Sequence, residues 1–169
     1  MRYTSATMFL SLKRTPSSPA LVDSLKRLPD QIAAALLCAR GLKLPFALRD
    51  IDRIVVNGMG GSNLGAEIIR SVFRDSLKLP LMIEPGYEVP GYVNVRTLYI
   101  ITSYSGNTEE PLTAYAAAKH RGARILVIAG EGDNKLAKLA LKNKLPCLLF
   151  PTTTNPSKQP RLGLGLAIG

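Results

Sequence analysis

The chain has 169 residues, 46% of them hydrophobic, which is enough for one domain with a substantial core and too few for two of ordinary size. No apolar run approaches the length needed to cross a bilayer, so we expect no membrane-spanning segment and no membrane partner. The formal net charge is +10, but the 22 basic residues are scattered without a dense run, which argues against a nucleic-acid partner.

The cysteines and the only histidine offer no obvious chemistry. Cys38 and Cys147 have neither a metal-ligand spacing nor a disulfide pattern, so we expect core thiols, no metal and a reducing, cytoplasmic location. His120 lies just before Gly122 at a predicted helix end, where the helix dipole favours a basic side chain. Residues 1–20 are predicted to be a poorly ordered segment that precedes one domain over residues 21–169.

The first predicted elements are helical. Apolar residues at helical spacing predict a helix over residues 21–37, after a Ser/Pro-rich segment at residues 15–19. Pro29 should interrupt this helix, Asp30 should cap its second part, and Gly41 should end it.

Apolar runs and helical segments alternate through the rest of the chain. Strands are predicted at residues 53–57, 81–83, 98–101, 124–128 and 147–150. Helices are predicted after the first, third and fourth strands, whereas the Pro- and Gly-rich residues 84–91 predict a surface connection. This order predicts an α/β fold with a doubly wound parallel sheet of about five strands.

A strand end, a polar loop and a helix start follow one another within residues 100–115. The loop contains three hydroxyl side chains and a glycine, namely Ser103, Ser105, Gly106 and Thr108. Pro111 fits a first helical turn, where its missing N–H is no loss, so the free backbone N–H groups lie at or before it. Such donors at a helix N-terminus predict a phosphate site.

A simpler interpretation of the same loop remains open. Asn107 or Thr108 could cap the helix while the serines satisfy a turn. Three hydroxyls exceed what one cap requires, which favours the anion site. Glu109 and Glu110 would repel a phosphate if they turned inward, so we expect both to point to solvent or to neighbouring N–H groups.

The glycine-rich residues 58–65 form a second strand-to-helix loop without a complete nucleotide motif. A dinucleotide fingerprint that starts at Gly58 would need glycine at Asn63, and a P-loop that starts at Gly60 would need lysine at Ala66. Backbone N–H groups and the Ser62 hydroxyl remain available to a polar ligand. The alternative is a glycine turn used only for close packing of helix and strand.

The two loops should lie side by side if the strand order resembles that of flavodoxin. In doubly wound sheets, ligands bind outside the carboxyl ends of the strands, where the winding direction switches. A phosphate on residues 103–108 and hydroxyls on residues 58–62 would together suit a sugar phosphate.

At these loops the sequence resembles the sugar isomerase (SIS) domain, and more closely the N-terminal half of the bifunctional phosphoglucose/phosphomannose isomerase family. The similarity covers roughly residues 25–165. The matching stretches are Leu28-Pro29-Asp30-Gln31-Ile32, Asn57-Gly58-Met59-Gly60-Gly61-Ser62, Tyr87-Glu88-Val89-Pro90, Ser103-Tyr104-Ser105-Gly106-Asn107-Thr108-Glu109-Glu110 and Gln159-Pro160-Arg161.

This resemblance implies an aldose–ketose isomerase that interconverts glucose 6-phosphate or mannose 6-phosphate with fructose 6-phosphate, as a homodimer and without metal or organic cofactor. By position, the substrate and chiefly its phosphate would be held by Gly61, Ser62, Ser103, Ser105 and Thr108. Arg161 would stabilise the negative charge of the enediolate intermediate, because a fixed guanidinium can favour developing oxyanion charge. The alternative for Arg161 is an ordinary surface arginine.

The resemblance also implies parts that this chain lacks. Family enzymes carry a second SIS domain, which contributes a glutamate base and a histidine for ring opening, and neither has a counterpart here. The first hypothesis is therefore a sugar-phosphate-binding half of an isomerase, incomplete for catalysis. The second is a non-catalytic regulatory module that binds sugar phosphates, and the third, nucleotide binding, requires the glycine pattern to have been misinterpreted.

Overall fold

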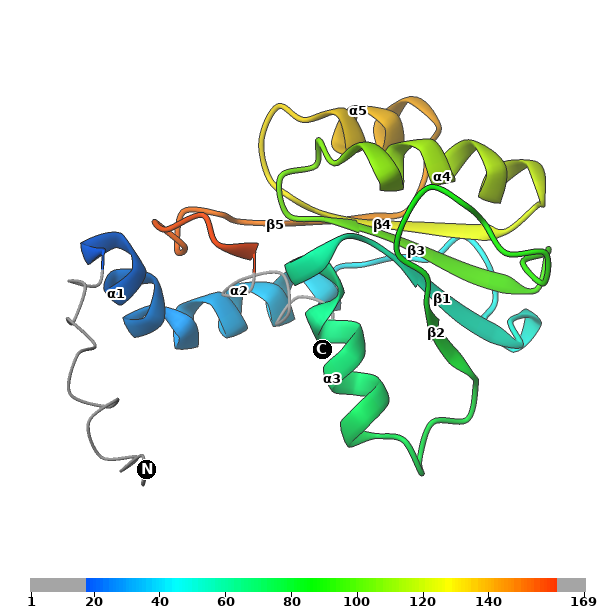
Figure 1. The fold of residues 1–169 in the computed structure, drawn as a ribbon, viewed down its shortest axis with the longest axis horizontal. Helices are drawn as coiled ribbons and strands as arrows, with labels where there is room; N and C mark the ends of the chain where they lie inside the picture. Colours follow the sequence, from blue (N-terminus) through cyan, green and yellow to red (C-terminus); the bar gives the residue numbers. More distant parts are fainter. Residues whose placement is uncertain (1–17, 161–169) are drawn as a thin grey trace, which may run out of the picture.

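The computed structural model describes residues 18–160 (Figure 1). Residues 1–17 of the predicted N-terminal segment, and Arg161, lie outside the described residues. The strands are β1 (Arg53–Asn57), β2 (Leu81–Ile83), β3 (Thr97–Ser103), β4 (Arg124–Gly130) and β5 (Cys147–Phe150). The helices are α1 (Pro19–Lys26), α2 (Leu28–Arg40), α3 (Leu64–Val72), α4 (Glu109–His120) and α5 (Lys135–Lys142), with 3-10 turns η1 (Leu48–Asp50) and η2 (Gly60–Asn63).

The five strands form one parallel sheet in the order β2-β1-β3-β4-β5. This is the flavodoxin-like order, so the predicted doubly wound sheet is confirmed. The chain winds outward in one direction from β1 to β2 and in the other from β3 to β5. The switch point therefore lies between β1 and β3.

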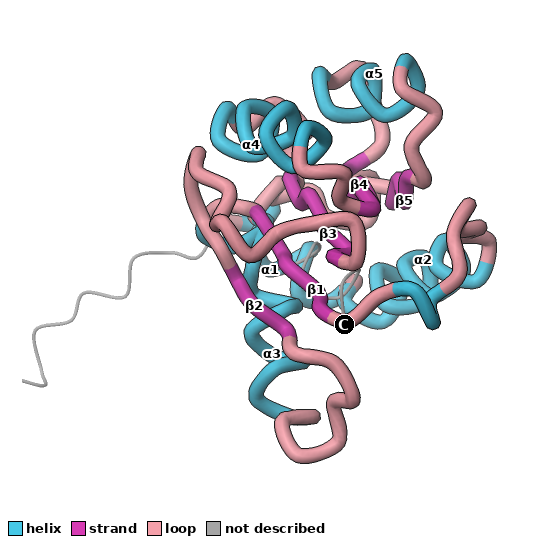
Figure 2. The backbone as a smooth tube through the Cα atoms, turned by 90° about the vertical axis from the view of Figure 1, so that its right-hand side faces the viewer, coloured by secondary structure: helices cyan, strands magenta, loops and turns pink. Residues whose placement is uncertain are grey.

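Helices cover both faces of the sheet. The two views agree that α4 and α5 lie on one face and α1, α2 and α3 on the other (Figures 1 and 2). Alternate residues of the central strands enter separate cores. Tyr99 and Val127 pack on the side of α4 and α5, whereas Leu98 and Leu126 pack with Cys38 of α2. This two-sided burial explains why the strands consist of continuous apolar runs.

Two local details differ from the sequence-based expectations. The helical segment breaks at Arg27, and Pro29 lies in the first turn of α2, where its missing N–H is tolerated. Asp30 is consequently a first-turn residue and not the cap, so that prediction was wrong. The β2–β3 connection is not purely a surface connection as predicted, because Val89 and Val93 are buried in the core beneath α4.

No helix within residues 18–160 combines the length and the apolar character that a bilayer crossing demands. Cys38 and Cys147 are free and half-buried, and burial raises the pKa of the Cys147 thiol to about 11. A thiol with this pKa remains protonated and unreactive at neutral pH.

The α5 helix offers a matched test of the core. Leu136 is fully buried, whereas Leu141 on the same helix is 75% exposed. Leu136→Ala should lower the free energy of unfolding by about 2–5 kcal/mol, because it leaves a cavity in the core. Leu141→Ala should change it by less than about 0.5 kcal/mol. Urea unfolding of both variants measures the difference, and equal effects would contradict this packing of α5.

Candidate functional site

The loops after β1 and β3 meet at the switch point, as the sequence predicted. The backbone N–H of Tyr104 donates to Ser62 Oγ at 3.4 Å, and Thr102 Oγ1 donates to the Ser62 carbonyl at 3.2 Å. A Cβ on Gly58 would lie only 2.1 Å from Thr102 Oγ1. Gly58 is therefore required by the close approach of the two loops, and not by a nucleotide motif.

Hydroxyl groups form hydrogen bonds within the loop that follows β3. Ser103 Oγ and Thr108 Oγ1 are 2.7 Å apart, and Ser103 Oγ also accepts a hydrogen bond from the Gly106 N–H at 3.0 Å. Gly106 has a φ of +66°, a conformation that glycine adopts without strain. Ser103, Gly106 and Thr108 thus form a tight turn at the start of α4. We call residues 103–109 the anion loop.

The start of α4 is not capped by a side chain. Thr108 occupies the N-cap position, but its hydroxyl pairs with Ser103 and caps no backbone N–H group. The simple capping role considered for Thr108 is therefore not seen. Within residues 18–160, the N–H groups of Ser105, Thr108 and Glu109 donate to no other group of the protein. These donors, together with the helix dipole, favour an anion.

Asn134 braces the anion loop from α5, and sequence reasoning missed it. A Cβ on Gly106 would lie 2.0 Å from Asn134 Oδ1, so the loop backbone lies directly against this amide. Asn134 Oδ1 caps α5 by accepting from the Ala137 N–H, and Leu136 N–H donates to the Gly106 carbonyl. An asparagine immediately before a helical run is an N-cap signal that could have identified Asn134.

The predicted site residues fall into two groups. Ser103 and Ser62 are buried, with their hydroxyls already hydrogen-bonded, whereas Ser105 is exposed and Gly61 and Thr108 are half-buried. The structure brings all five to the carboxyl end of β1 and β3. The predicted sixth residue, Arg161, lies outside the described residues.

Two acidic side chains stand at the junction of the anion loop and α4. Glu109 is exposed, as expected for a side chain that points to solvent, and Glu110 is half-buried. Burial raises the pKa of Tyr87, and the nearby charges of Glu110 and Glu109 raise it further, so this tyrosine lies on the same side of the site. The described part of the chain contains no cluster of three His, Cys, Asp or Glu side chains that could hold a metal ion.

Comparison with known proteins identifies relatives with sugar-phosphate chemistry. A bifunctional phosphoglucose/phosphomannose isomerase from Caldicellulosiruptor bescii is 37% identical over 145 residues, covering 86% of this chain and 41% of the relative. The enzyme of the same name from Thermoplasma volcanium is 32% identical over 121 residues, covering 71% and 35%. The chain thus spans well under half the length of these relatives.

Solved structures confirm the fold. The C-terminal domain of glucosamine-fructose-6-phosphate aminotransferase from Francisella tularensis aligns with a TM-score of 0.58 at 16% identity, over 86% of this chain and 45% of that one. Tagatose-6-phosphate ketose/aldose isomerase from Escherichia coli aligns with a TM-score of 0.57 at 20% identity, over 88% and 42%. Residues 47–146, which include β1 to α5 and both loops, match the SIS domain. The chain belongs to the SIS domain family.

Proposed function

We propose that the chain binds a hexose 6-phosphate as the SIS domain of a glucose-6-phosphate/mannose-6-phosphate isomerase, with fructose 6-phosphate as the shared ketose. The observation that carries this proposal is the set of free N–H donors on Ser105, Thr108 and Glu109 at the uncapped start of α4. Phosphate is one of the anions that such donors at a helix N-terminus bind. The isomerase relatives provide the chemical class of the sugar.

The hydroxyl pair adds a further donor. Because Ser103 and Thr108 share one hydrogen bond, one of their two hydroxyl protons stays available to a phosphate oxygen. Ser105 is exposed, and its hydroxyl can turn toward the same ligand. Gly61 and Ser62 would then face the sugar from the neighbouring loop. Arg161 would stabilise the enediolate charge.

We do not propose that this chain alone catalyses the aldose–ketose isomerisation. Moving a proton between two carbons requires a base within hydrogen-bond reach of the substrate. The carboxylates in and next to the anion loop, Glu109 and Glu110, belong to the first turn of α4. We expect the base to come from the part of the relatives that this chain does not span.

Calorimetric titration with fructose 6-phosphate tests the anion loop. The Ser105→Ala/Thr108→Ala variant should bind at least about tenfold more weakly, because hydrogen bonds to a charged group each contribute about 1.5–3 kcal/mol. Ser71→Ala/Thr113→Ala, at exposed helical positions, removes the same two kinds of hydroxyl and should bind like the wild type.

Equal affinity of the two double variants would contradict the proposed site. An isomerase assay on the same samples should detect no turnover. Turnover by the wild-type chain would show that the base lies within these 169 residues.

We also propose that two copies associate through the apolar surface of α2 and α3, which lie on the same side of the sheet (Figure 1). The exposed apolar side chains here, which we call the α2–α3 face, are Ile32, Leu36, Leu37, Leu64, Ile68, Val72 and Phe73. Large apolar side chains exposed on the helices of one face are candidates for burial in an association site. A second copy would bury this face by two-fold symmetry.

The oligomeric state tests this surface. Leu37 on α2 is 72% exposed and Leu141 on α5, across the sheet, is 75% exposed. Leu37→Glu should convert a dimer to a monomer, because a buried unpaired charge is costly, whereas Leu141→Glu should leave it dimeric. Light scattering after size-exclusion chromatography measures the oligomeric state of the wild type and of both variants. A wild type that stays monomeric at its highest soluble concentration, or dissociation by Leu141→Glu alone, would contradict the α2–α3 interface.

A further inference from the structure

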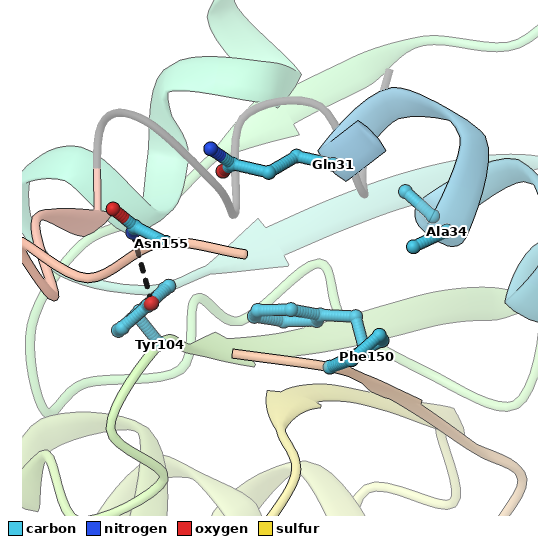
Figure 3. Close-up of a pocket in the computed structure, with 7 residues that line it drawn as sticks. Gln31, Ala34, Tyr104, Phe150 and Asn155 are labelled. Carbon is cyan, nitrogen blue, oxygen red and sulfur yellow. Dashed lines mark hydrogen bonds between the residues drawn. The ribbon is translucent and has the colours of Figure 1, made fainter. Parts of the chain in front are cut away.

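A small cavity lies between α2, the end of β5 and the anion loop. Its volume is about 10 Å³, which is at the lower limit for a single water molecule and too small for anything larger. Its walls are mainly apolar, and polar side chains enter from Gln31, Tyr104 and Asn155 (Figure 3). The remaining lining residues are Ala34, Ala35, Phe150 and Pro151.

An open chain of hydrogen bonds begins and ends at this cavity. Asn155 Nδ2 donates to the Tyr104 hydroxyl at 2.9 Å, and Asn155 Oδ1 accepts from Ser157 Oγ at 2.9 Å. The Ser157 N–H donates to Ser24 Oγ at 2.9 Å. Gln31 Nε2 in turn donates to the Ser24 carbonyl at 3.0 Å. The chain therefore runs from the anion loop through residues 155–157 and α1 to α2.

The two ends of this chain are chemically complementary. Gln31 is 6% exposed, and its Oε1 has no hydrogen-bond partner among residues 18–160. The Tyr104 oxygen accepts from Asn155, so its proton remains free for another acceptor. Burial raises the pKa of Tyr104, and its hydroxyl therefore keeps this proton at neutral pH. One end thus needs a donor and the other needs an acceptor, at the same cavity.

We propose that one buried water molecule binds in this cavity, accepts from the Tyr104 hydroxyl and donates to Gln31 Oε1. The water closes the hydrogen-bond chain into a ring. Tyr104 lies between Ser103 and Ser105, so the ring holds the anion loop against α2 and residues 155–157. Gln31 and Asn155 are then positioning residues that act on the loop through Tyr104. The proposed water site does not depend on phosphate binding, whereas the positioning role rests on the proposed phosphate site.

A high-resolution crystal structure of the wild-type chain tests the water site directly. We expect one ordered water at about 2.7–3.2 Å from both Tyr104 Oη and Gln31 Oε1. A cavity without water, or a direct Tyr104–Gln31 hydrogen bond, would overturn the proposal. This result does not depend on whether the chain binds a phosphate.

Two variants that each remove one end of the ring test the positioning role. Gln31→Met and Tyr104→Phe should each raise the dissociation constant for inorganic phosphate about two- to tenfold, the size expected for one hydrogen bond. The double variant should show no further rise, because both changes break the same ring. Lys43→Met, at an exposed position, should leave the constant unchanged.

The amide NMR signals of Ser105 and Gly106 provide a readout that does not require phosphate. They should shift in Gln31→Met and in Tyr104→Phe but not in Lys43→Met. Unmoved signals in a folded variant, or additive losses of phosphate affinity in the double variant, would refute the positioning role. A wild type that binds no phosphate would instead refute the proposed function. The crystal structure and the amide shifts would still show whether the ring of hydrogen bonds forms.

Discussion

The site depends on how closely the carboxyl ends of β1 and β3 approach each other. Only a glycine fits at position 58, because any Cβ there would overlap Thr102 Oγ1. The approach lets Ser62 Oγ accept a hydrogen bond from the Tyr104 backbone N–H. This bond links the glycine-rich loop after β1 to the anion loop. The β2-β1-β3-β4-β5 order places this junction at the switch point, where a doubly wound sheet leaves a crevice for a ligand.

The capacity of this junction to bind an anion depends on which group the Thr108 hydroxyl pairs with. A threonine at an N-cap ordinarily satisfies one of the first amides of the helix. Here the hydroxyl pairs with Ser103, and the amides at the start of α4 keep their hydrogen-bonding capacity and the positive end of the dipole. Asn134 and the Leu136 N–H hold Gly106 from α5. The anion loop is thus braced before any ligand arrives, which reduces the entropy lost on binding.

Sequence patterns predicted the sheet well because its strands are buried on both faces and read as apolar runs. The predicted bounds of β1, β2 and β5 coincide with the structure. The helix break was misplaced by two residues, because proline is as acceptable inside a first turn as at an interruption. An N-cap signal marks Asn134, but its contact with Gly106 joins residues distant in the chain, as does the Asn155–Tyr104 hydrogen bond. No local pattern reveals such contacts. The burial of Val89 was likewise hidden within the Pro- and Gly-rich residues 84–91, and that of Val93 just after them.

An amide NMR titration of the wild-type chain with fructose 6-phosphate tests the central claim most directly, because it locates the bound phosphate residue by residue. We expect the largest saturable shifts at Ser105, Gly106, Thr108 and Glu109, with smaller shifts at Gly61 and Ser62. Shifts confined to the exposed lysines of α5, or spread evenly over the basic surface, would mean that the chain attracts anions only through its net charge of +10. That result would contradict a phosphate site at the start of α4.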